Sequence, residues 1–158
     1  MIPVMIRQGI YARDYTAEDR LACLTLFDGN TPEFLDPVER NEYSQFLDDL
    51  PCPYLVVSSV DGGVVGAGGY YVTEDPCVGA LAWGLVARAW HKRGVGSELL
   101  QLRLSHLRAS GVGAVRVRTS QRSRGFFERS GFRVVRVVPQ GFTPVLDSVE
   151  LQLALHAA

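Results

Sequence analysis

The spacing of apolar residues changes period in the middle of the chain, and this change constrains the fold more than any other feature of the sequence. Residues 79–86 form a β-rich run, whereas residues 94–110 repeat their apolar side chains at helical spacing. The apolar arc of this helix is broken only by Arg103, and Gly111 closes the helix. Residues 114–119 alternate apolar and charged side chains, as in a half-buried strand. A strand, a helix and a second strand in this order predict a sheet on which the helix packs.

The segments on either side of this unit extend the predicted sheet. Residues 54–60 and 64–72 are β-rich and are joined by Asp61-Gly62-Gly63, which is a hairpin signal. Together with residues 79–86 they predict an antiparallel meander. The element order predicts a single α/β domain over residues 1–158, with a mixed central sheet and helices on both faces. The remaining expected elements are a strand at 10–15, helices at 16–30, at 36–50 and up to Ser130, and strands at 132–138 and 149–155.

The turn that leads into the helix at 94–110 has the composition of an anion-binding site. It reads His91, Lys92, Arg93, Gly94, Val95, Gly96 and Ser97. Unpaired amides and the dipole at a helix N-terminus favour anions, and the two glycines allow the backbone to approach a phosphate closely. A P-loop motif is absent, and a dinucleotide fingerprint would need glycine where the chain has Leu99. The alternative interpretation is an ordinary helix start with a solvated basic turn.

Two motifs at the expected separation give the chain a family resemblance. His91-Lys-Arg-Gly94-Val-Gly96 matches the pattern [Q/R]-x-x-G-x-[G/A] that follows a strand and opens a helix. Further on, Phe126-Phe-Glu-Arg-Ser-Gly-Phe132 is similar to a "Y-E-K-L-G-F" stretch. The chain therefore resembles the GNAT superfamily of acyl-CoA-dependent N-acyltransferases. The resemblance implies acetyl-CoA as the acyl donor, an amine as the acceptor, and a parallel strand pair that splays apart to admit the donor.

The resemblance also implies which residues contact the coenzyme. Backbone amides of Leu85 and Val86 would pair with the pantetheine arm, and the amides of residues 93–97 would hold the pyrophosphate. Ser120 stands where the family often has Asn, and two phenylalanines would flank the arm. The expected cofactor-binding residues are Leu85, Val86, His91, Lys92, Arg93, Gly94, Val95, Gly96, Ser97, Ser120, Phe126 and Phe127.

The sequence departs from the family at the groups that move protons. Phe127 occupies the position of the frequent general acid Tyr, and it cannot donate a proton. Ala80, Ala82 and Trp83 stand where some relatives have a basic Glu. We therefore expect direct attack by a neutral amine, with the oxyanion held by a backbone amide near Leu85 or Val86. Ser120 and Tyr71 are the candidate catalytic donors.

The acceptor side is less well defined by the sequence. By family resemblance it maps to residues 30–37, Tyr70, Tyr71, Trp83 and residues 141–147. Trp83 suits an apolar acceptor part if it faces the cleft, and core packing is the alternative. The carboxylates in segments that could reach this side are Glu33, Asp147 and Glu150, whereas Glu74 lies at the start of the hairpin that leads to the run at 79–86. For each of the four, an exposed surface position is the alternative. We expect a small-molecule amine.

Charge and cysteine usage limit the partners and the compartment. The formal net charge is −1, which gives no general field to attract nucleic acid or a membrane. The three cysteines lack C-x-x-C spacing, so we expect no metal and a reducing compartment. The N-terminal segment has no signal-peptide pattern, and a cytoplasmic location is expected. A homodimer is compatible with the sequence.

Two other functional classes stay open. A catalytically inactive acyl-CoA-binding or regulatory module would keep the glycine turn and lack acid and base groups. Nucleic-acid binding is a weaker alternative, because a solvated strand face would show the same residues. It rests on Arg116, Arg118, Arg122, Arg124, Arg129, Arg133 and Arg136.

Overall fold

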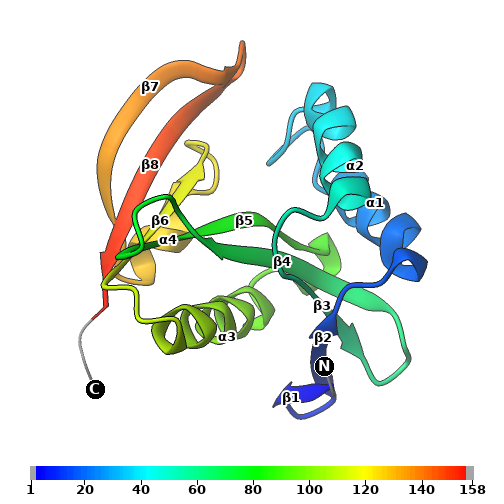
Figure 1. Ribbon diagram of the computed structural model, residues 1–158. Coiled ribbons are helices and arrows are strands. Elements are labelled where there is room, and N and C mark those ends of the chain that lie inside the picture. Colours follow the sequence, from blue (N-terminus) through cyan, green and yellow to red (C-terminus); the bar gives the residue numbers. More distant parts are fainter. Residues whose placement is uncertain (1–2, 156–158) are drawn as a thin grey trace.

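A computed structural model describes residues 3–155, and within them the strands form an eight-stranded sheet in the order β1-β2-β3-β4-β5-β6-β8-β7 (Figure 1). Neighbouring strands are antiparallel except β5 and β6, which are parallel. The prediction of a mixed sheet in one α/β domain is confirmed. The strands are β1 Val4–Arg7, β2 Ile10–Asp14, β3 Tyr54–Ser59, β4 Val64–Val72, β5 Val78–Val86, β6 Ala114–Thr119, β7 Arg133–Thr143 and β8 Leu146–Ala154.

Helices cover both faces of the sheet, as predicted (Figure 1). On one face, α1 and α2 pack an apolar cluster that includes Phe27 and Tyr43 against β3, β4 and β5. On the other face, α3 packs Leu100, Leu104 and Leu107 against β5, β6 and β8. The helices are α1 Arg20–Gly29, α2 Arg40–Asp49, α3 Val95–Ala109 and α4 Arg124–Arg129, and short 3-10 turns lie at Ala17–Asp19, Pro37–Glu39 and Arg88–Trp90.

The parallel pair of strands opens toward the N-terminal end of α3. The register of β5 with β6 runs only from Val78 opposite Ala114 to Ala80 opposite Arg116. Beyond these residues the strands are no longer paired, so the ends of β5 and β6 splay apart. This is the geometry that the family resemblance implied.

A bulge interrupts β5 just where the strands separate. Ala67 of β4 pairs with Leu85 and Gly69 pairs with Ala82, so Trp83 and Gly84 together oppose one residue. Trp83 has a φ of 43°, in the left-handed region. The hydroxyl of Tyr54 donates to the Trp83 carbonyl at 2.7 Å and holds the bulge in place. A bulge of this kind re-aims the side chains that follow it.

The structure differs from the predicted elements at both ends of the sheet. Strand β1 was not expected from the sequence. Strands β7 and β8 reach Thr143 and Leu146, so much of the segment expected to be a loop between residues 138 and 149 is the tip of a long hairpin. Pro139 is tolerated within β7 because β7 is the edge of the sheet and this position needs no ladder donor.

Candidate active site

A cavity of about 790 Å³ occupies the opening between β5 and β6. It extends from the turn before α3 to α4, the tip of the β7–β8 hairpin and the connection between α1 and α2. Most of the predicted site residues come together here. Those that line the cavity are Leu85, Val86, His91, Lys92, Gly94, Gly96, Ser97, Ser120, Phe126 and Phe127.

Three predicted site residues lie elsewhere. Val95 is only 1% exposed and belongs to the core under the sheet. Arg93 is exposed, and its guanidinium stacks over the ring of Trp90 at 4.0 Å. Tyr71 is 43% exposed near the far end of β4, opposite Ala80, and does not line the cavity.

The turn before α3 has the close backbone geometry that an anion site needs. Lys92 and Gly94 have φ values of 59° and 85°, so two residues of the turn are left-handed. A Cβ on Gly96 would lie 3.2 Å from the ring of Phe126. Because no side chain fills this place, Phe126 can pack directly over the first turn of α3. Gly94, Gly96 and Ser97 line the cavity at the N-terminal end of α3, where the helix dipole favours a phosphate.

His91 has a partner inside the protein. Its Nε2 lies 2.8 Å from the carbonyl oxygen of Val86, and a carbonyl can only accept, so Nε2 carries the proton. Asn30 donates to the same carbonyl at 3.0 Å. His91 also packs edge-on against Phe34. It therefore joins the end of β5 to the connection between α1 and α2.

Ser120 lies at the end of β6 and is 5% exposed. Its hydroxyl oxygen accepts from the amide of Arg122 at 3.2 Å, and its proton remains to donate. Phe127 packs edge-on against Phe126 and Phe132, next to the apolar cluster between α3 and the sheet. Of the two candidate donors, the structure brings only Ser120 to the cavity.

The opposite wall of the cavity is acidic and aromatic. Glu39 and Glu42 line it beside Phe34 and Trp83. The Trp83 ring also packs 4.9 Å from the ring of Tyr43, so this side chain faces the cavity and belongs to the core cluster as well. Burial raises the pKa of Glu39, whose carboxylate accepts from the amide of Asp36 at 3.0 Å.

These two glutamates were missed in the sequence. The carboxylates considered there, at positions 33, 74, 147 and 150, do not line the cavity. Glu33 pairs with Arg88, and Asp147 accepts from the amide of Gln140. The spacing of Asp36 and Glu39 could have indicated the position of Glu39. A Glu three residues after an N-cap residue forms a capping box, which holds its side chain near the helix start.

Two arginines hold the segments around the cavity, and one of them, Arg122, links its two walls. Arg122 donates to the carbonyls of Pro32 and Glu33 at 2.8 and 2.7 Å. Arg118 stacks over the ring of Phe142 at 4.2 Å and donates to Ser148 at 2.7 Å. These contacts account for two of the arginines that suggested nucleic-acid binding.

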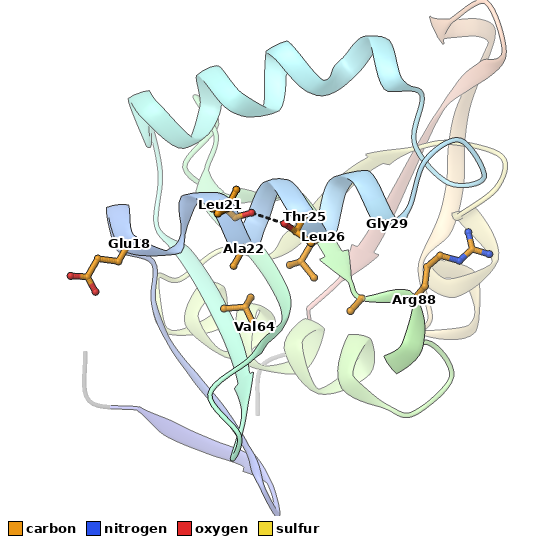
Figure 2. Close-up of a pocket in the computed structure, with 9 residues that line it drawn as sticks. Glu18, Leu21, Ala22, Thr25, Leu26, Gly29, Val64 and Arg88 are labelled. Carbon is orange, nitrogen blue, oxygen red and sulfur yellow. Dashed lines mark hydrogen bonds between the residues drawn. The ribbon is translucent and has the colours of Figure 1, made fainter.

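A second hollow, of about 590 Å³, lies along α1 on the outside of the molecule (Figure 2). Leu21, Ala22, Leu26 and Val64 give it a mainly apolar lining. The hydroxyl of Thr25 donates to the Leu21 carbonyl within the helix, as Figure 2 shows, and so it does not serve a ligand. The lining of this hollow includes neither the glycine turn nor the aromatic rings that line the larger cavity.

Within residues 3–155, no three His, Cys, Asp or Glu side chains come together as a metal site. No helix in the described part of the chain is long and apolar enough to cross a membrane.

Solved structures share this fold. The yncA protein of Salmonella typhimurium, solved with its cofactor acetyl-CoA, is 20% identical and gives a TM-score of 0.69 over 94% of this chain and 96% of its own. A GCN5-related N-acetyltransferase from Kribbella flavida is 21% identical, with a TM-score of 0.73 over 94% and 99%. An aminoglycoside 6'-N-acetyltransferase complexed with coenzyme A is 11% identical, with a TM-score of 0.74 over 93% and 98%.

Comparison by sequence gives the family. A search of curated protein sequences finds no match to this chain. The sequence model described as the acetyltransferase (GNAT) family matches residues 21–132, which is well over half of the chain and includes the glycine turn, β5, β6 and α4. On this match, and with the splayed strands and the cavity between them, the chain belongs to the GNAT acetyltransferase family.

Proposed function

We propose that this protein transfers an acetyl group from acetyl-CoA to a primary amine of a small molecule. One observation carries the proposal: a single cavity runs from the glycine turn at α3 to the wall that contains Glu39 and Glu42. The first end suits the anionic phosphates of the donor, because it offers a helix N-terminus and Lys92. The other end suits a cationic amine. An acyl donor and an amine can therefore meet at the bulge of β5.

The donor side is supported by the relatives solved with acetyl-CoA and with coenzyme A. In this chain, the amides at Gly94 and Gly96 would bind the pyrophosphate, and Phe126 would flank the pantetheine arm. The carbonyl of Val86 is already bonded to Asn30 and His91. Backbone amides at this strand end, near Leu85 and Val86, would bind the arm.

The acceptor side is supported by its carboxylates and rings. Glu39 and Glu42 would attract an ammonium group, and the faces of Trp83 and Phe34 favour a cation or an apolar stem. A carboxylate with a raised pKa is a stronger base than an ordinary Glu. Glu39 therefore fits the role of taking the proton from the acceptor, directly or through a water.

The reaction needs one proton removed and one supplied. The amine nitrogen attacks the thioester carbon, the C–S bond breaks, and sulfur leaves with the electron pair as a thiolate. That thiolate then takes a proton to give free coenzyme A. Ser120 is the donor that the geometry favours, since it lines the cavity and its hydroxyl proton is available.

The proposal is tested by incubating the protein with acetyl-CoA and separate classes of amine, and by measuring release of the free thiol. Amino acids, polyamines, aminoglycosides and peptide N-termini cover the main classes. We expect saturable turnover with one small-molecule class. The inactive acyl-CoA-binding module is the second candidate, favoured by Phe127, whose ring packs against Phe132 in the core and supplies no acid. Tight binding of acetyl-CoA with no thiol released by any amine would establish that module instead.

A further inference from the structure

Arg103 lies in the middle of α3 with its guanidinium under the bulge of β5. A Cβ on Gly68 would come within 3.0 Å of the guanidinium carbon, and a Cβ on Gly84 would come within 3.2 Å of Nη2. The guanidinium therefore fills a cradle that exists because both strands have glycine here. It also lines the cavity, at the level of Trp83 and Gly84.

The charge of Arg103 is buried without a counter-ion. The residue is 3% exposed, and it takes part in none of the ion pairs found within residues 3–155. Nη1 donates to the Gly69 carbonyl at 3.3 Å, while Nε has no partner among the described residues. Burial lowers the pKa of the guanidinium to about 10, so it is still a cation at neutral pH.

Such a residue is costly to the fold. An isolated buried charge loses its hydration, and replacing a buried charged group with an apolar one of similar volume is often neutral or stabilising. An apolar side chain at position 103 would continue the arc of Leu99, Leu100 and Leu104. The absence of a protein counter-ion therefore favours a ligand in the cavity that carries or develops negative charge.

We propose that the Arg103 guanidinium stabilises the negative charge that develops on the acyl donor at the bulge of β5, first on the thioester oxygen and then on the departing sulfur. The inference rests on the proposed function. Gly84 is exposed, and the guanidinium lies directly against it, so the cation is separated from the reacting atoms by a backbone with no side chain. A preorganised charge that is itself buried from water acts strongly on charge that forms beside it.

This role adds to those proposed for Glu39 as the base and Ser120 as the proton donor. When the amine attacks, the C=O electron pair moves to oxygen, and Arg103 lowers the energy of that oxyanion. When the pair returns and the C–S bond breaks, the same cation lowers the energy of the thiolate, so that protonation need not accompany bond cleavage. A cation beside the acceptor also favours the neutral amine over the ammonium form.

The first test separates this role from simple packing. Arg103→Met keeps an unbranched apolar stem and removes the charge, and Arg103→Lys keeps the charge. Arg108→Met, on an exposed position of the same helix, is the control. We expect Arg103→Met to keep or raise the melting temperature and to lower kcat about 10²–10³-fold, with KM for acetyl-CoA nearly unchanged. Arg103→Lys should recover part of kcat. A lower melting temperature with unchanged kcat would show that Arg103 only fills space.

The second test needs no acceptor. The pKa of the coenzyme A thiol is measured in the complex by the ultraviolet absorbance of the thiolate. We expect the thiol pKa to be at least about one unit lower in the wild-type complex than in the Arg103→Met complex, since a nearby cation favours the charged form. Equal thiol pKa values would overturn the inference and leave the proposed function intact. If the wild-type protein binds no coenzyme A, both the role of Arg103 and the proposed function are wrong.

A third outcome would also overturn the inference. If Arg103→Met raises KM only for acceptors that carry a carboxylate and leaves kcat unchanged, the guanidinium recognises the acceptor and does not act on the acyl group. Comparing an amine with its carboxylate-bearing analogue on the same variants decides this point.

Discussion

Gly96 shows how a single residue shapes the cavity. It lies in the first turn of α3, between the ring of Phe126 and the side chain of Val86, whose Cγ2 would be 3.6 Å from a Cβ at this position. Both neighbours line the cavity, so a side chain at position 96 would displace Phe126 or Val86 and change the shape of the cavity.

We therefore expect Gly96→Val to weaken binding of acetyl-CoA at least about tenfold, which is ~1.4 kcal/mol, while the fold persists. Isothermal titration calorimetry measures the affinity, and circular dichroism checks the fold. Gly63→Val is the control, because the nearest atom to a Cβ at Gly63 is 4.0 Å away and this hairpin does not line the cavity. An unchanged affinity for Gly96→Val would mean that the coenzyme does not use this turn.

The second residue-scale prediction concerns proton supply. If Ser120 protonates the thiolate, Ser120→Ala should lower kcat by about 10²–10⁴-fold with little change in KM for acetyl-CoA. Ser123→Ala is the control, since Ser123 lines the same cavity but its side chain makes no capping bond to α4. Steady-state thiol release is measured for both variants. A kcat within about threefold of the wild-type value for Ser120→Ala would show that water or the product amine supplies the proton.

At the scale of elements, the connection between α1 and α2 is held by contacts from the other side of the cavity. Arg122, which follows β6, donates to two carbonyls of this connection, and His91 packs on Phe34 within it. The acceptor wall is therefore built on the α1–α2 connection but fixed by residues much further along the chain, about 90 residues in the case of Arg122.

Removing this link should loosen the acceptor wall. We expect Arg122→Met to speed amide hydrogen exchange in residues 30–36 about tenfold and to raise KM for the acceptor, because two charge-assisted hydrogen bonds are lost. Arg124→Met is the control, since within residues 3–155 the Arg124 side chain pairs only with Glu128, on the exposed side of α4. Hydrogen exchange with mass spectrometry gives the rates. The same exchange in both variants would mean that α1 and α2 hold the connection by themselves.

On the scale of the whole molecule, the cavity is the place where the two halves of the sheet meet. β1 to β5 carry α1 and α2 on one face, and β6, β8 and β7 complete the sheet beyond the opening (Figure 1). The strands there are paired over only three residues of β5. A ligand that bridges the opening should therefore tie the two halves together.

Acetyl-CoA should raise the melting temperature of the protein. At a hundredfold excess over its dissociation constant, a ligand selective for the folded state adds about 2.7 kcal/mol, or roughly 5–10 °C for a chain of this size. Differential scanning fluorimetry measures the shift, and adenosine is the control because it lacks the pyrophosphate and the thioester. No shift with millimolar acetyl-CoA would count against the donor assignment.

The order of the elements and the glycine turn before α3 could be predicted from local sequence patterns. The change from period two to helical period, the hairpin signal at Asp61-Gly62-Gly63 and the glycine turn are local patterns, and local backbone preferences act on them directly. For this reason the meander, α3 and the turn at Gly94 and Gly96 appear in the structure where the sequence placed them.

The lining of the cavity by Glu39 and Glu42 and the position of Arg103 depend on contacts between segments that are far apart in the sequence. Strict alternation would put Leu81 and Leu85 on one face of β5, but the bulge between them places Leu81 in the cluster under α3 and Leu85 in the cluster under α1 and α2. Periodicity cannot locate such an extra residue. It also cannot tell that two glycines on separate strands leave room for a guanidinium, because that cradle forms only when β4 and β5 pair above α3.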